Sequence, residues 1–224
     1  MTQLMQHEMD KLKKQLLELS AVVEESVQSS ITSLEKIDRV LAEKVIAGDD
    51  QIDRMEVELE EECLKILALH QPVAIDLRFI IAVLKINNDL ERIGDLAANI
   101  AERAVALADS GRIEPPFDFS AMAASTRQML KGSLDCLVQM DTVMAQHVLD
   151  LDDEVDAMHS RNFQLIKDQI RQHPDHLESL THYLTVSRHL ERIADLATNI
   201  AEDVYYMIEG EIVRHTCNWP RQAK

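Results

Sequence analysis

The stretch "LERIADLATNIAE", residues 190–202, repeats almost letter for letter the stretch "LERIGDLAANIAE", residues 90–102. Only Gly94 against Ala194 and Ala98 against Thr198 distinguish the two copies, which we call the acidic phrases. Both copies are rich in Leu, Ile, Ala and Glu and contain no proline, a composition typical of α-helix. The sequence therefore predicts one equivalent helix in each half of the chain.

A second pair of matching stretches extends the likeness between the halves. "DDQIDRM" at 49–55 parallels "DDEVDAM" at 152–158, and the helix-breaking "QP" at 71–72 corresponds to "HP" at 173–174. Between the halves lies "DSGRIEPPFD" at 109–118, where Gly and paired Pro cannot continue a helix. The pattern indicates an internal repeat of about 100 residues with three helices in each copy.

Hydrophobic periodicity sets the expected helix boundaries. Gly48 is expected to end the first helix, and Gly210 is a natural C-cap for the last. The expected helices span about residues 4–47, 49–69, 72–108, 119–149, 151–172 and 175–209. We predict an all-α protein of two tandem, pseudo-symmetric three-helix bundles, with the first repeat at 1–110, a linker at 111–118, the second repeat at 119–215 and a C-terminal tail at 216–224.

The amino-acid composition limits the kinds of binding partner and the cellular compartment that we expect. The 224 residues include 40 acidic and 23 basic ones, a net charge of −17, and this balance excludes a nucleic-acid partner, which needs clustered Lys and Arg. Cys63, Cys136 and Cys217 form no CxxC pair, which predicts free thiols in a reducing cytosol. The N-terminus lacks the apolar core of a signal peptide, and "FIIAVLKI" at 79–86 is far shorter than the ~20 residues of a membrane helix. We expect a soluble, cytoplasmic protein that does not insert into a membrane, while peripheral docking on a membrane complex stays open.

The polar residues of the acidic phrases gather on one helical stripe. Taking Glu91 as zero, Asp95 falls at roughly 40°, Asn99 at roughly 80° and Glu102 at roughly 20°. The apolar residues fall nearly opposite, so the carboxylates belong to a face separate from the core stripe. The second phrase repeats this face with Glu191, Asp195, Asn199 and Glu202.

The other repeated stretch carries carboxylates at the same spacing. Asp49 and Asp53 are four residues apart, as are Asp152 and Asp156, and His159 stands where the first half has an acid. Like charges at this spacing destabilise a helix by a few tenths of a kcal/mol per pair, and two such helices side by side repel further. A multivalent cation between them would remove the repulsion, and carboxylate oxygens suit Mg²⁺, Mn²⁺, Fe or Zn²⁺. The alternative is a solvated acidic face that binds nothing.

Signatures of enzymes are scarce in this chain. A di-iron carboxylate bundle needs inward-facing Glu residues and two ExxH motifs, whereas the nearest match is the single Asp156-Ala-Met-His159. No GxGxxG, P-loop, GxSxG or HExxH motif occurs. We expect no enzymatic activity. The alternatives are a metal-binding or metal-storage bundle with redox or hydrolytic activity, and a structural adaptor without metal.

The chain resembles the PhoU family of bacterial phosphate-transport regulators. The resemblance covers essentially the whole chain and rests on the doubled acidic phrases, the Asp-rich helix starts, "QPVAIDLR" at 71–78 and "YYMIEGEIVRH" at 205–215. It implies two pseudo-symmetric three-helix bundles with metal clusters on exposed acidic faces. In the family, E(D)xxxD motifs supply the ligands, with iron or zinc expected first and Mg, Mn or Ni as alternatives.

Carried onto this chain, the resemblance gives two sites. The first consists of Asp49, Asp53, Glu91 and Asp95. The second consists of Asp152, Asp156, Glu191 and Asp195, and the expected additional contributors are Asn99, Glu102, Asn199 and Glu202.

Two features differ between the halves. The segment of Pro72, Asp76 and Arg78 has no good copy after Pro174, so any role of this segment belongs to the first bundle alone. Asp76 lies in the first turn of an expected helix, where negative charge is favourable in any case. His159 in place of an acid is expected to alter the metal preference of the second site.

The resemblance implies a non-enzymatic regulator of phosphate uptake. A PhoU-like protein is expected to couple the high-affinity phosphate ABC importer to a sensor histidine kinase, holding off the phosphate-starvation response when phosphate is plentiful. The expected partners are the importer's ATPase subunit and the kinase, and a homodimer is expected for such a family. The metal could hold helices in register, form part of a contact surface or bind phosphate as a bridging anion, and the sequence leaves these roles open.

Overall fold

The computed structural model describes residues 3–110 and 113–211. These residues form six α-helices, α1 Gln3–Lys36, α2 Arg39–His70, α3 Ala74–Ser110, α4 Phe119–Gln139, α5 Thr142–Gln172 and α6 Leu177–Glu209, with a 3-10 turn at Pro174–His176. Cys217, the predicted tail, residues 212–215 of the predicted second repeat and residues 111–112 of the predicted linker lie outside the described residues.

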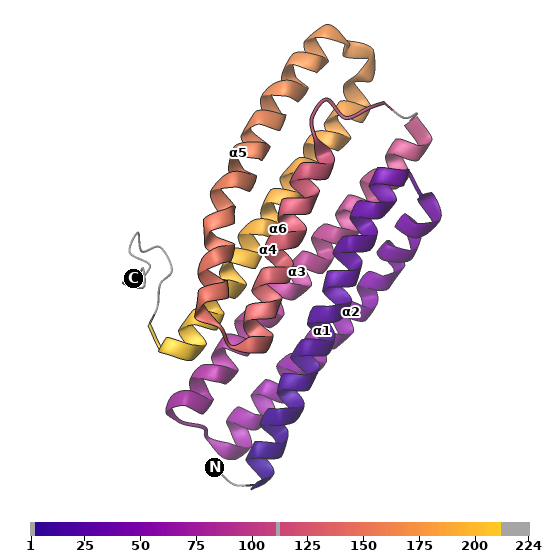
Figure 1. Cartoon of the computed structure of the whole chain (residues 1–224). Coiled ribbons are helices and arrows are strands. Elements are labelled where there is room, and N and C mark those ends of the chain that lie inside the picture. Colours follow the sequence, from indigo (N-terminus) through magenta and orange to yellow (C-terminus); the bar gives the residue numbers. More distant parts are fainter. Residues whose placement is uncertain (1–2, 111–112, 212–224) are drawn as a thin grey trace.

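The helices form two three-helix bundles placed side by side (Figure 1). α1, α2 and α3 pack on one another, and so do α4, α5 and α6. The bundles join mainly where α3 and α6 run along each other, and more narrowly through α1 and α4. The predicted all-α fold with a doubled three-helix unit is confirmed.

Two predicted helix boundaries are wrong. α1 stops at Lys36 and α2 begins at Arg39, so Gly48 lies inside α2 and does not end the first helix. In the second repeat, α4 stops at Gln139 and α5 begins at Thr142, well before the predicted break near residue 150. The first two helices of each bundle are therefore joined by a very short turn.

Each of these turns is built from a left-handed residue followed by a capping aspartate. Ile37 has φ 51° and Met140 has φ 52°, a conformation that reverses the chain after the last helical turn. The carboxylates of Asp38 and Asp141 then cap α2 and α5 by accepting first-turn backbone amides at 3.0 and 2.8 Å. Because neither turn contains glycine or proline, the breaker pattern used on the sequence could not reveal them.

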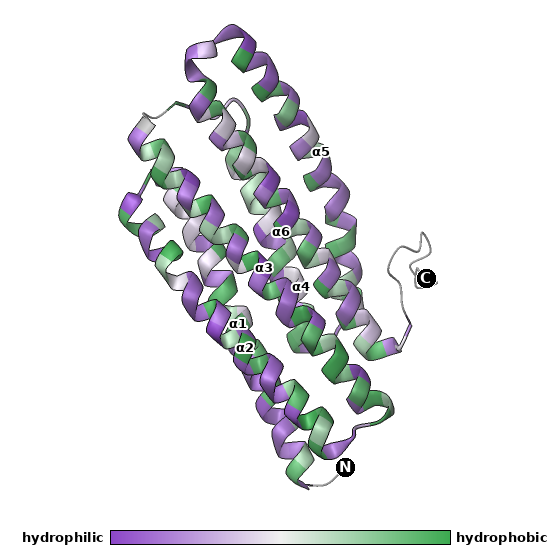
Figure 2. Ribbon diagram, turned by 180° about the vertical axis from the view of Figure 1, so that it is seen from behind, coloured by the Kyte–Doolittle hydropathy of each residue, from purple (hydrophilic) through white to green (hydrophobic). Residues whose placement is uncertain are grey.

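The apolar stripes of the acidic phrases supply the centre of the core. Ile93, Ile100, Ile193 and Ile200 are all fully buried. Figure 2 shows hydrophobic and hydrophilic residues alternating along every helix, as amphipathic helices require. None of the described helices combines the length and the apolar character that crossing a membrane requires.

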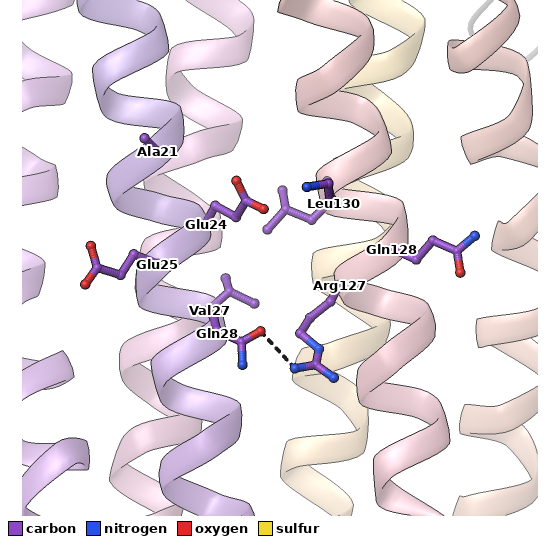
Figure 3. A pocket seen from close by; sticks show the side chains of 9 residues that line it. Ala21, Glu24, Glu25, Val27, Gln28, Arg127, Gln128 and Leu130 are labelled. Carbon is purple, nitrogen blue, oxygen red and sulfur yellow. Dashed lines mark hydrogen bonds between the residues drawn. The ribbon is translucent and has the colours of Figure 1, made fainter.

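The seam between α1 and α4 is open at the surface. It forms a groove of about 510 Å³, where the side chains of Glu24 and Leu130 face each other across the two helices (Figure 3). The guanidinium of Arg127 donates a hydrogen bond to the Gln28 side chain at 2.8 Å. The acidic phrases lie away from this seam, on α3 and α6.

Candidate functional site

The first acidic groove, defined by Asp49, Asp53, Glu91 and Asp95, lies between α2 and α3. Each helix contributes two carboxylates from consecutive turns. Asp49 and Glu91 are partly buried, whereas Asp53 and Asp95 are exposed at the rim. The helices approach closely because Gly94 has no side chain, and a Cβ there would lie 3.5 Å from the Asp49 Oδ1 atom. The two acidic faces predicted from the sequence are thus brought together in the first repeat.

The carboxylates of the first acidic groove repel one another, and the charge of Arg92 offsets this repulsion only in part. Desolvation, followed by the charges of Asp95 and Asp53, raises the pKa of Asp49 to about 6. Desolvation and then neighbouring carboxylates also raise the pKa of Glu91 and of Asp95. Acids whose pKa values rise together favour either a proton or a cation in their midst.

The second acidic groove, defined by Asp152, Asp156, Glu191 and Asp195, lies between α5 and α6. Desolvation and then the charges of Glu191, Asp152 and Asp156 raise the pKa of Asp195 to about 6. The pKa of Asp152 is also raised, chiefly by desolvation, although the hydroxyl of Thr198 donates to its carboxylate at 3.3 Å. The two repeats therefore share a groove of carboxylates with raised pKa values as well as a fold.

Each acidic groove offers four hard oxygen donors, which suit a divalent or trivalent cation such as iron, zinc, Mg²⁺ or Mn²⁺. Among the described residues, no three His, Cys, Asp or Glu side chains converge closely enough to hold one ion. The donor chemistry therefore fits a metal, while chelation requires the carboxylates to rotate toward one another. Metal binding by these eight residues stays a prediction.

The other four predicted ligands have different surroundings. The amide of Asn99 donates to the backbone carbonyl of Asp95 at 2.8 Å within the same helix. Glu102 pairs with the adjacent arginine at 2.8 Å, Asn199 lines the cleft between α3 and α6, and Glu202 is partly buried. A stripe drawn on one isolated helix does not tell which neighbouring helix will cover it. A role in metal binding for these four residues stays a prediction.

A cleft of about 910 Å³ beside the second acidic groove was not predicted. We call it the basic cleft, defined by His159, Thr185, Arg188, His189 and Arg192. Its signal in the sequence is "SRHLER" at 187–192, which replaces "NNDLER" at 87–92 in the first half. This difference in charge lies directly beside the nearly identical acidic phrases, whose similarity masks it.

The basic cleft gathers positive charge around one imidazole. Burial, and then the charges of Arg103, Arg192 and Arg188, lower the pKa of His189. His159 contributes from α5, and its Nδ1 lies 3.0 Å from the Ser187 hydroxyl. The second repeat therefore places acidic and basic groups side by side, and His159 is the part of this arrangement that the sequence analysis identified.

The segment of Pro72, Asp76 and Arg78 has a structural partner in the other repeat. The Arg78 guanidinium packs against the backbone of Gly210, the C-cap of α6, so closely that a Cβ at Gly210 would collide with it. Gly210 has φ 80°, which also favours glycine. The segment thus ties the start of α3 to the end of α6, which explains why only one repeat carries it.

Known proteins resemble this chain over most of its length. The family model described as "PhoU domain" matches residues 16–104 and 119–204. A relative from Aquifex aeolicus, named phosphate-specific transport system accessory protein PhoU homolog, is 39% identical over 208 residues, covering 93% of this chain and 94% of the relative. A relative of the same name from Pseudomonas aeruginosa is 34% identical over 209 residues, covering 93% and 86%.

Two solved structures share the fold. The crystal structure of PhoU from Pseudomonas aeruginosa superposes with a TM-score of 0.88 at 34% identity, covering 92% of this chain and 99% of that one. The phosphate transport system regulatory protein PhoU from Streptococcus pneumoniae gives a TM-score of 0.82 at 29% identity, covering 93% and 99%.

Proposed function

This chain belongs to the PhoU family, and from that premise we propose that it represses the phosphate-starvation response while phosphate is plentiful. Its relatives are accessory and regulatory proteins of phosphate transport, not enzymes. As an accessory protein of the phosphate-specific transport system, the chain associates with that transporter. We assign it the finer role of coupling the ABC importer's ATPase subunit to a sensor histidine kinase on the cytoplasmic side of the membrane, and of restraining uptake.

The charge of the molecule supports contact with basic partner surfaces. The chain carries a net charge of −17, and part of it is concentrated in the two acidic grooves. Such concentrated charge steers association with oppositely charged proteins and weakens with salt. A homodimer would present each groove twice to these partners.

We further propose that each acidic groove binds a metal ion, with iron or zinc first and Mg, Mn or Ni as alternatives. The observation that supports this most directly is the doubled set of mutually repelling carboxylates. Asp49, Asp53, Glu91 and Asp95 would hold one ion, and Asp152, Asp156, Glu191 and Asp195 the other. Each ion would supply the missing positive charge and fix the register of the helix pair that carries its ligands.

The test is alkaline phosphatase activity in the native host grown in excess phosphate. Deleting the gene should raise this activity, and the wild-type gene should restore repression. A variant with Asp49→Asn, Asp53→Asn, Asp152→Asn and Asp195→Asn should leave the activity high. The matched control is Glu58→Gln with Glu61→Gln, which removes exposed carboxylates of α2 outside the groove and should repress normally.

The outcomes separate the two parts of the proposal. Low phosphatase activity in the deletion strain would contradict the role in repression. Full repression by the four-residue variant, with its fold confirmed by circular dichroism, would contradict the need for metal in the grooves while leaving the regulatory role intact.

A further inference from the structure

Two clefts are lined by equivalent positions of α3 and α6, one between α3 and α6 and the other between α5 and α6. The first, of about 440 Å³, includes Lys85, Asn88, Asp89 and Arg92 in its lining. In the basic cleft the equivalent positions of the second repeat hold Thr185, Arg188, His189 and Arg192. The helix positions that line the two clefts are equivalent, but the charges they carry differ.

In the first cleft the chain supplies its own counter-charges. The Lys85 ammonium lies 3.3 Å from the carboxylate of Asp203, whose side chain is 2% exposed. The Arg92 guanidinium lies 4.0 Å from the carboxylate of Asp89. Both cations therefore already have an anionic partner within the fold.

At the positions equivalent to Asp89 and Asp203, the other repeat carries basic residues. His189 stands where the first repeat has Asp89, and Arg103 stands where the second repeat has Asp203. Within the part of the chain that the structure describes, neither Arg188 nor Arg192 forms an ion pair. The two arginines are exposed, and the charge of Arg192 partly offsets the raised pKa of Asp195 in the same cleft.

Two buried donors or acceptors beside the cleft also lack partners. His189 Nδ1 and Arg103 Nε are buried and make no hydrogen bond in the described structure. Buried polar atoms are rarely left unsatisfied, and a bound water, ion or polar ligand beside them supplies the missing partner. Their position next to Arg188 and Arg192 indicates an anionic ligand.

We propose that the basic cleft binds inorganic phosphate through the guanidiniums of Arg188 and Arg192 and the imidazole of His189. Arginine presents paired N–H donors that match a tetrahedral oxyanion. A regulatory role of this site rests on the proposed function. A repressor of the phosphate-starvation response that binds phosphate would respond directly to the phosphate concentration. A cation on Glu191 and Asp195 would neutralise the carboxylates that line the cleft among the described residues, and it would strengthen the site.

The surrounding charge favours a small anion over a polyanion. Glu191 and Asp195 lie at one side of the cleft, and the chain as a whole carries −17. A nucleic acid would meet this repulsion at every phosphate, whereas one inorganic phosphate contacts only the local arginines.

The test is equilibrium dialysis of radiolabelled inorganic phosphate against the full-length protein as purified, with its metal content measured alongside. We expect saturable binding of one phosphate per chain. Arg188→Gln and Arg192→Gln should each weaken it about tenfold, as loss of a charge-assisted hydrogen bond does. Arg92→Gln, at the equivalent position of the first repeat, is the matched control and should bind phosphate as the wild type does.

Absence of saturable binding, or an equal loss in Arg92→Gln, would overturn the assignment. Tighter binding of adenosine monophosphate than of inorganic phosphate would contradict it too, because the phosphate group would then belong to a larger ligand. If phosphate does not bind but the wild-type gene still represses alkaline phosphatase, the inference fails and the proposed function stands. If phosphate binds but deleting the gene leaves the alkaline phosphatase activity low, the inference stands and the proposed function fails.

Discussion

The carboxylate of Asp49 is partly buried beside Asp95 and Asp53, and its pKa is raised from 3.8 to about 6 by desolvation and then by those neighbours. The folded chain therefore binds this proton more tightly than the unfolded chain does. The stabilisation is fully present below the ordinary carboxyl pKa and is lost as the pH rises through about 6. Asp195 behaves in the same way in the second repeat.

From this sign we predict the pH dependence of the metal-depleted protein. Its midpoint of thermal unfolding should be higher at pH 5 than at pH 7.5, and saturating metal at pH 7.5 should raise it again. Scanning calorimetry in matched buffers with and without a chelator measures both effects. The lowered pKa values of His182 and His189 act in the opposite direction, so the matched comparison is the Asp49→Asn, Asp195→Asn variant. The same pH dependence in wild type and variant would show that the grooves do not hold repelling charges.

Asp49→Asn should stabilise the metal-depleted protein at pH 7.5 by roughly 0.5–1 kcal/mol, an estimate reduced for solvent screening of partly exposed charges. The amide keeps the shape of the side chain and removes its charge. Urea unfolding compares this variant with Glu58→Gln, which neutralises an exposed carboxylate elsewhere on α2 and should leave stability unchanged. Equal effects in the two variants would contradict a local cause.

At the scale of the helices, α2 packs closely on α3 and α5 packs closely on α6, and each of these contacts uses a different pair of residues. A Cβ on Gly94 would lie 2.9 Å from Ile52 Cδ1, whereas in the second repeat the equivalent pair is Ala194 and Val155, both buried. One repeat places the extra carbon on α2, and the other places it on α6. The two differences between the repeats thus compensate each other in volume.

We therefore predict coupling between Gly94→Ala and Ile52→Val. Ile52→Val alone should cost about 0.5–1.5 kcal/mol, the usual loss for a buried methyl group. In the Gly94→Ala background this cost should be smaller by about 1 kcal/mol, because the new methyl group fills the space. A double-mutant cycle measured by urea unfolding gives the coupling, and additive effects would refute the compensation.

We also expect backbone strain at Met140, in the short turn before α5. Met140 has φ 52°, a conformation that disfavours side chains by about 1–2 kcal/mol. Met140→Gly should therefore stabilise the protein by about 1 kcal/mol. Gln139→Gly, one residue earlier and still helical, should instead destabilise it by about 1 kcal/mol. Urea unfolding distinguishes the two, and a loss of stability in Met140→Gly would contradict the strain.

These turns also show where the sequence was insufficient. Long amphipathic periodicity and the doubled phrases were enough to predict six helices in two bundles, because they depend on which residues are buried. The turns at Ile37 and Met140 were not predicted, because the left-handed conformation of a residue other than glycine is imposed by packing. The amino-acid composition of the turn does not reveal it. Aligning "KID" at 36–38 with "QMD" at 139–141 would have located both.

At the scale of the whole molecule, the pairing of acidic faces was predictable and the basic cleft was not. Asp49 and Glu91 carry their charge in the sequence, and helix adjacency within one bundle brings them together. The basic cleft is lined by α5 and α6, and the pKa of its His189 is also lowered by Arg103, which comes from α3 in the other bundle. Contacts between repeats have no periodic signal, so this influence of Arg103 on His189 requires the structure.

We propose that the two acidic phrases form two equivalent metal-binding grooves, one in each repeat. Elemental analysis of protein purified without chelator tests it most directly, using the wild type, Asp49→Asn with Asp53→Asn, Asp152→Asn with Asp195→Asn, and all four together. The account predicts that either double variant retains about half of the wild-type metal and that the fourfold variant retains none. Wild-type protein without stoichiometric metal, or a fourfold variant that keeps its full content, would contradict it.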